Sequence, residues 1–167
     1  MSDGFACLVI ADESPEFPAA LTYAASLAKN AGWRILMLKV VEPSEPAPWA
    51  SISEEMRRQA HAAAESLTQR FAAEVWAESG ITIEPLLVEG EERPEIRKLL
   101  EADHSIKLVV LAAAHGAGGP GPLVGSLAKG GLGGRAVPVL VVPGWLTKDE
   151  VRQLALPMQP DPPAPSA

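Results

Sequence analysis

Residues 108–142 read LVVLAAAHGAGGPGPLVGSLAKGGLGGRAVPVLVV, and this stretch decides how the whole chain is interpreted. An apolar run typical of a buried strand leads into a glycine-rich loop, then into Gly125-Ser126, and finally into a second apolar run. Nine of the 14 glycines lie between Gly116 and Gly134. Glycine lets backbone N–H groups wrap an anion without interference from a Cβ atom, so the stretch indicates a phosphate-holding loop. The same composition also suits a flexible loop that holds no ligand.

Outward from this stretch, strand patterns alternate with helix patterns along the chain. Runs rich in apolar residues predict five strands: Phe5–Ala11, which is continuously apolar as in a parallel-sheet strand buried on both faces, and Trp33–Val41, Ile81–Val88, Ile106–Ala112 and Val137–Val142. Helices are predicted between them at Glu16–Ala31, from Ser51 to Gly80, from Pro94 to about Asp103, and from Gly125-Ser126 onward. The alternation predicts an α/β fold, a doubly wound and Rossmann-like five-stranded parallel sheet with helices on both faces. Pro85 would remove a ladder hydrogen bond, which places its strand at a sheet edge.

Local signals predict where helices begin and where the domain ends. Ser14-Pro15 has the pattern of an N-cap followed by proline at the first helical position, and Ser51 with Glu54 has capping-box spacing. One domain is predicted over residues 1–144. Residues 145–167 are predicted to form a C-terminal extension, in which Thr147 and Glu150 cap a short helix ahead of a proline-rich tail that we expect to be disordered.

Composition excludes several classes of function. The net charge of −7 argues against nucleic acid as a partner, because phosphate backbones are bound by clustered Lys and Arg. No apolar run reaches the roughly 18 residues of a membrane helix, and no basic segment precedes the first apolar run as in a signal peptide. We therefore expect a cytoplasmic protein with no membrane partner. Cys7 is predicted to be a buried core thiol, and the three histidines lack the spacing of metal ligands.

Two segments are placed to meet a ligand. In doubly wound sheets, ligands bind beyond the carboxyl ends of the strands, where the strand order reverses. Asp12 follows the first predicted strand, and its carboxylate can accept hydrogen bonds from ribose hydroxyls or an adenine amine. The loop from Ala113 to Ser126 follows the fourth strand and leads to a helix N-terminus, where N–H groups and the helix dipole favour negative charge. Together the two segments predict a nucleotide site.

From Asp12 to the closing VPVLVVP, the chain resembles the universal stress protein family. The family's nucleotide motif is glycine, two residues, glycine, nine residues, then glycine followed by serine or threonine. Here Ala113-Ala114-His115-Gly116 is followed by eight residues and then by Gly125-Ser126, and the twelve-residue step from Ser126 to Pro138 matches the family's last helix and strand. ADESPEFPAAL looks like the first loop and helix, and LLVEGEERPEIRKLLEADHSIKLVVL like the third strand, helix and fourth strand.

The resemblance implies a fold of the adenine nucleotide alpha hydrolase type and a bound adenine nucleotide, ATP, with Mg²⁺ as an accompanying ion. It implies that Asp12 contacts the nucleoside and that the Val40 backbone recognises adenine. Phosphates would be held at Gly116, Gly125 and Ser126, in a loop that begins at Ala113. Ala113 stands where the motif has its first glycine, and the loop is one residue short, so we expect Ala113→Gly to tighten binding.

Two interpretations of function follow. No set of base, nucleophile and oxyanion donors is recognisable, so an efficient enzyme is not indicated. The first interpretation is an ATP-responsive regulator of the stress response with at most slow hydrolysis. The alternative is a dimeric interaction module of the same fold that no longer binds nucleotide. Under both, the resemblance implies a homodimer paired through the fifth strand; which other proteins bind is not encoded in these motifs.

Overall fold

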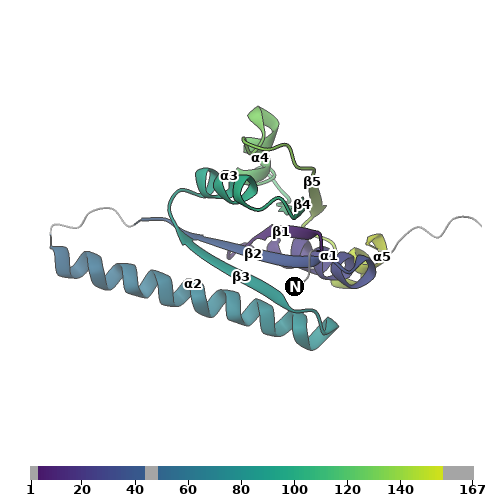
Figure 1. The fold of residues 1–167 in the computed structure, drawn as a ribbon, viewed down its shortest axis with the longest axis horizontal. Coiled ribbons are helices and arrows are strands. Elements are labelled where there is room, and N and C mark those ends of the chain that lie inside the picture. The colour runs from purple at the N-terminus through teal and green to yellow at the C-terminus, as the bar shows by residue number, and fades with distance from the viewer. Residues whose placement is uncertain (1–3, 44–48, 156–167) are drawn as a thin grey trace, which may run out of the picture.

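The computed structural model describes residues 4–43 and 49–155. Its centre is a sheet of five parallel strands in the order β3-β2-β1-β4-β5 (Figure 1). The strands are β1 (Ala6–Ile10), β2 (Arg34–Val41), β3 (Ile83–Glu89), β4 (Ile106–Ala113) and β5 (Val139–Pro143). The strand order reverses between β1 and β4, which are neighbours in the sheet although far apart in the chain. The predicted doubly wound parallel sheet is confirmed.

Helices cover both faces of the sheet. The helices are α1 (Phe17–Ala31), α2 (Ala50–Ser79), α3 (Glu92–Ala102), α4 (Pro122–Gly130) and α5 (Lys148–Leu154). One core cluster joins α1, α2 and α5 to strand residues such as Cys7 and Met37, and a second joins α3 and α4 to residues such as Leu8 and Leu36. Successive strand residues therefore face opposite cores, as the period of two in a strand requires. Figure 1 shows α3 and α4 on the opposite side of the sheet from α2.

Burial along the strands agrees with the predictions for the first and third strands. All five residues of β1 are buried, and Cys7 has no exposed surface. Strand β3, which carries Pro85, lies at one edge of the sheet as predicted, and β5 lies at the other edge. Because the two edge strands are partly exposed, Leu87 and Val141 each keep more than a third of their surface open to solvent.

Several predicted helix starts are wrong. Helix α1 begins at Phe17 with Glu16 at the N-cap, and Ser14 instead donates its hydroxyl and backbone N–H to Asp12. The N-cap of α2 is Trp49, so Ser51 and Glu54 form no capping box there. The capping box of Thr147 and Glu150 is confirmed at the start of α5.

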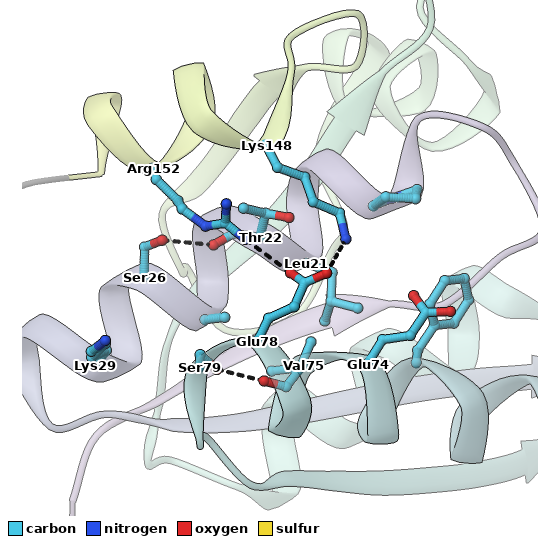
Figure 2. A pocket seen from close by; sticks show the side chains of 13 residues that line it. Leu21, Thr22, Ser26, Lys29, Glu74, Val75, Glu78, Ser79, Lys148 and Arg152 are labelled. Carbon is cyan, nitrogen blue, oxygen red and sulfur yellow. Dashed lines mark hydrogen bonds and ion pairs between the residues drawn. The ribbon is translucent and has the colours of Figure 1, made fainter.

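Helix α5 is attached to the main body by packing and by charge. Val151 is fully buried in the core shared with α1, and the Asn30 side-chain amide donates to the Ala155 carbonyl at 3.2 Å. The Glu78 carboxylate of α2 lies between Lys148 and Arg152, at 2.5 and 2.9 Å (Figure 2). The extension up to Ala155 thus packs on the domain. The predicted disordered tail lies outside the described residues.

Candidate functional site

A cavity of about 300 Å³ opens where the strand order reverses, beyond the carboxyl ends of β1 and β4. Its lining comes from the loop after β1, the first turns of α1 and α3, the end of β4 and the segment that leads into α4. The lining residues are Ile10, Asp12, Ser14, Glu16, Phe17, Ala20, Glu92, Leu111, Ala112, Ala114, Pro120, Gly121, Pro122, Leu123 and Val124. The location is the one expected for a ligand in a doubly wound sheet.

Asp12 lies in this cavity, and its orientation is set by the adjacent turn. Its Oδ1 atom accepts from the Ser14 backbone N–H at 2.9 Å and from the Ser14 hydroxyl at 2.6 Å. Both of these bonds are to Oδ1, and no described residue bonds to the Oδ2 atom, so it is available to accept from a ligand hydroxyl or amine. One carboxylate oxygen therefore holds the turn, and the other is left for a ligand in the cavity that Asp12 lines.

The segment leading into α4 supplies hydrogen-bond donors. The helix begins at Pro122, and its first internal backbone bond runs from the Gly125 N–H to the Gly121 carbonyl at 2.9 Å. Proline has no N–H, so the helix N-terminus offers the N–H groups of Gly121, Leu123 and Val124, three residues that line the cavity. Such unpaired N–H groups and the helix dipole favour an anion.

The prediction that Gly125-Ser126 begins this helix is therefore wrong. Both residues lie inside α4, where the Gly125 N–H is already bonded and the Ser126 hydroxyl donates to the Leu123 carbonyl at 2.9 Å. Gly121-Pro122 starts the helix one turn earlier, because proline with its fixed φ is favoured at the first helical position. This signal was present in the sequence and was missed.

The structure does not bring the six predicted site residues together in one cavity. Asp12 lines the main cavity, and Val40 lines an adjoining one of about 420 Å³. Ala113 ends β4 opposite Pro143 and accepts from the Gly144 N–H at 2.9 Å, whereas Gly116 is an exposed loop residue with φ of 124°. Neither Ala113 nor Gly116 is among the residues that line either cavity.

Glu92 was not among the site residues predicted from the sequence, and it connects the two cavities. It comes from the first turn of α3 and lines both the cavity of Asp12 and that of Val40. Burial raises the pKa of its carboxyl; the negative charges of Asp12 and then Glu42 add to this, and Lys39 opposes them. No sequence signal marked Glu92, because an acid in the first turn is common on any helix.

The glycine turn that follows α4 is packed against α3. The Arg135 guanidinium donates to the backbone carbonyls of Leu100, Asp103 and Ile106 at 2.9, 3.1 and 2.8 Å. Arg93 donates to the Gly131 carbonyl at 2.9 Å. These arginines bind backbone oxygens of the protein and are not directed at the cavity.

A second hollow, of about 100 Å³, lies between α1, α2 and α5 and is shown in Figure 2. The polar groups in it bond to one another: Ser26 donates to the Thr22 carbonyl and Ser79 to the Val75 carbonyl. Since Glu78 is also paired with the cations of α5, this hollow has the character of a packing seam. Over the described ranges, no three His, Cys, Asp or Glu side chains group as metal ligands, and no helix is long and apolar enough to cross a membrane.

Comparison with known proteins identifies a matching family and solved structures with a similar fold. A model of the universal stress protein family matches residues 6–143. The universal stress protein UspA from Lactobacillus plantarum is a structural neighbour with a TM-score of 0.69 and 20% identity, covering 83% of this chain and 97% of that one. No curated protein matches the chain.

Two further structural neighbours contain nucleotides. A universal stress protein family protein from Arabidopsis thaliana, with AMP bound, has a TM-score of 0.57 and 17% identity, covering 83% of this chain and 91% of that one. A universal stress protein in complex with cAMP has a TM-score of 0.52 and 16% identity, covering 84% and 98%. At these identities the likeness shows a shared fold.

Proposed function

The chain belongs to the universal stress protein family, and from this premise we propose that it binds an adenine nucleotide at the cavity of Asp12 and the α4 N-terminus. One observation carries the proposal. Asp12, with one carboxylate oxygen unbonded, and the first residues of α4, whose N–H groups have no helical partner, line the same cavity at the point where the strand order reverses. The carboxylate suits ribose hydroxyls, and the N–H groups suit a phosphate.

Adenine would lie on the Val40 side of the site. Val40 lines the adjoining cavity, Glu92 lines both, and the main cavity of about 300 Å³ is of the size that small ligands occupy. A nucleotide extended from Val40 past Glu92 to the α4 N-terminus would use both cavities. Two structural neighbours have AMP or cAMP bound, which supports the same class of ligand here.

ATP and Mg²⁺ are the ligands that the family resemblance implies. Mg²⁺ would be held mainly by the phosphates and water, as is usual for nucleotide-bound magnesium, with at most one or two of the cavity carboxylates. Among the described residues that line the cavity, none is Lys, Arg or His. Hydrolysis would therefore be slow at most, and the protein would act as a nucleotide-responsive regulator of the stress response in the cytoplasm.

The first experiment identifies the ligand. Freshly purified protein is denatured, any released nucleotide is identified by chromatography and mass, and the emptied protein is titrated with adenine nucleotides. Near-stoichiometric nucleotide, or saturable binding on titration, is expected. No released nucleotide together with no binding would sink the proposal and favour the interaction-module alternative.

A matched pair of variants tests the role of Asp12. Asp103 makes the same contacts with Ser105, at 2.9 and 2.6 Å, that Asp12 makes with Ser14. Asp12→Ala should weaken nucleotide binding by at least about tenfold, since a hydrogen bond to a charged acceptor is lost. Asp103→Ala loses an equivalent turn at a distance from the cavity and should leave the affinity unchanged. If the two variants bound nucleotide with equal affinity, Asp12 would not be part of the binding site.

We also propose that the chain forms a homodimer through β5. This strand is an edge of the sheet, Val141 is 39% exposed, and Pro138 and Pro143 flank the exposed segment, which would limit further edge growth. Light scattering should find a dimer for the native chain and a monomer for Val141→Lys. Leu87→Lys on the opposite edge is the control and should stay dimeric; a monomeric native chain would refute the proposal.

A further inference from the structure

We infer that the site prefers adenine nucleotides with a single phosphate over ATP, because the cavity that ends at the α4 N-terminus is lined by three carboxylates and offers only a small set of N–H donors. The inference rests on the proposed adenine-nucleotide function and concerns which nucleotide is selected. It departs from the ATP implied by the family resemblance.

Three carboxylates line the main cavity. Asp12 follows β1, Glu16 occupies the N-cap position of α1, and Glu92 lies in the first turn of α3. The aliphatic part of Glu16 packs closely over Gly144, where an added Cβ would lie 2.4 Å from the Glu16 Cγ atom. Glu16 is therefore held at the cavity by the backbone after β5. Burial, and after it the negative charges of Asp12 and Glu42, raise the pKa of the Glu92 carboxyl, as expected where carboxylates are gathered at one site.

The cations described around the site either lie outside the main cavity or are bonded to the protein backbone. None of the described residues that line the main cavity is Lys or Arg. Arg135 and Arg93 donate to backbone carbonyls, and Arg97 lies under Gly133 and Gly134. Lys39 lines the adjoining cavity, where three glutamates also line the wall. Lys129 is exposed in the last turn of α4, at the opposite end of that helix from the cavity.

The donors that remain match one phosphate group. Gly121, Leu123 and Val124 offer backbone N–H groups at one helix end, and the Gly125 N–H, which the sequence motif assigned to the phosphates, is used inside α4. A helix N-terminus stabilises a negative charge within its first turn, and the effect declines rapidly beyond it. The second and third phosphates of ATP would add charge beside the carboxylates and gain no equivalent donors.

The preference has a measurable size and a dependence on Mg²⁺. Repulsion between like charges in a partly solvated cavity predicts that free ATP binds at least about tenfold more weakly than AMP. Mg²⁺ neutralises part of the triphosphate charge, so it should raise the affinity for ATP far more than the affinity for AMP. The order expected without Mg²⁺ is AMP, then ADP, then ATP.

Titration calorimetry of adenosine, AMP, ADP and ATP, each with and without Mg²⁺, tests this order. Glu16→Gln and Glu92→Gln should each narrow the gap between AMP and ATP by several-fold. Asp149→Asn removes the same charge from α5, distant from the cavity, and should leave the gap unchanged. Circular dichroism verifies that each variant is folded.

The possible failures are distinguishable. If ATP binds as tightly as AMP or more tightly without Mg²⁺, the inference is wrong while adenine-nucleotide binding stands. The inference is also wrong if Asp149→Asn narrows the difference in affinity between AMP and ATP as much as Glu92→Gln does. The cause would then be the net charge of the protein and not the carboxylates that line the cavity. If none of the four ligands binds, the proposed function itself fails.

Discussion

Two glycine-rich segments on either side of α4 have different reasons for their glycines. In the loop of residues 116–121, an added Cβ would meet no atom within 4 Å at any of the four glycines. In the turn of residues 131–134, an added Cβ on Gly134 would lie 2.8 Å from the Arg97 Cγ atom and 2.9 Å from a Glu101 oxygen. The first segment is open and leads into the candidate nucleotide cavity, whereas the second is packed against α3.

Glycine content alone therefore does not locate a binding loop. The first segment uses glycine mainly for backbone conformation, since Gly116, Gly119 and Gly121 have positive φ. The second uses it for conformation and for close packing against α3, where Arg135 and Arg93 bond to nearby carbonyls. Substitutions in the packed turn should therefore cost stability, and those in the open loop should cost less.

The largest effect is expected at Arg135. Arg135→Met removes hydrogen bonds to three carbonyls and leaves them without that charged donor, which should lower the free energy of unfolding by about 3 kcal/mol in urea titrations. Lys129→Met removes the same charge from an exposed position and should change stability by less than about 0.5 kcal/mol. If the two variants were equally stable, the packed turn would not depend on Arg135.

The next effect separates the two segments directly. Gly134→Ala combines a φ of 71° with contacts to Arg97 and Glu101, so we expect a loss of about 2 kcal/mol in the free energy of unfolding. Gly118→Ala lies in the open loop at an ordinary φ and should change it by less than about 0.5 kcal/mol. If Gly118→Ala lowered the free energy of unfolding more than Gly134→Ala, the two segments would not differ in the way described.

A smaller effect isolates backbone conformation from packing. Gly119 has φ of 80° but open space around it, so Gly119→Ala should cost only the conformational strain, about 1 kcal/mol by thermal unfolding. Gly119→Asn should recover part of this loss, because asparagine tolerates the left-handed region better than alanine. No recovery by asparagine would indicate that something other than φ requires glycine here.

The smallest effect concerns the acidic wall beside the open loop. The folded-state pKa of Glu92 is raised, so its ionised form is disfavoured in the folded protein and stability is lost as pH rises through that pKa. Glu92→Gln should stabilise the protein by about a few tenths of a kcal/mol near neutral pH. The gain should vanish below about pH 4, where glutamate is protonated in both states. Melting temperatures across this range measure it; a gain that persists in acid would rule out charge as the cause.

Much of the architecture was predictable from local pattern. The apolar runs of β1 and β4 predicted buried strands of a parallel sheet, and Pro85 predicted the β3 edge, because burial on both faces and a missing N–H leave direct traces in the sequence. The capping box of Thr147 and Glu150 was also predictable, because it depends only on two residue types at a fixed local spacing. The start of α4 was mispredicted. Gly125-Ser126 matches the family motif, but proline is favoured at the first helical position, and the helix begins at Pro122.

The sequence by itself determined the order of elements, the parallel sheet and the position of Asp12 after β1, because hydrophobic periodicity and capping act over a few neighbouring residues. Only the tertiary structure decided which side chains share the cavity with Asp12. Glu92 reaches it from α3, the bonds of Arg135 are to backbone carbonyls around the end of α3, and the free N–H groups lie at Gly121, Leu123 and Val124. These outcomes depend on contacts between distant segments, which no local pattern encodes.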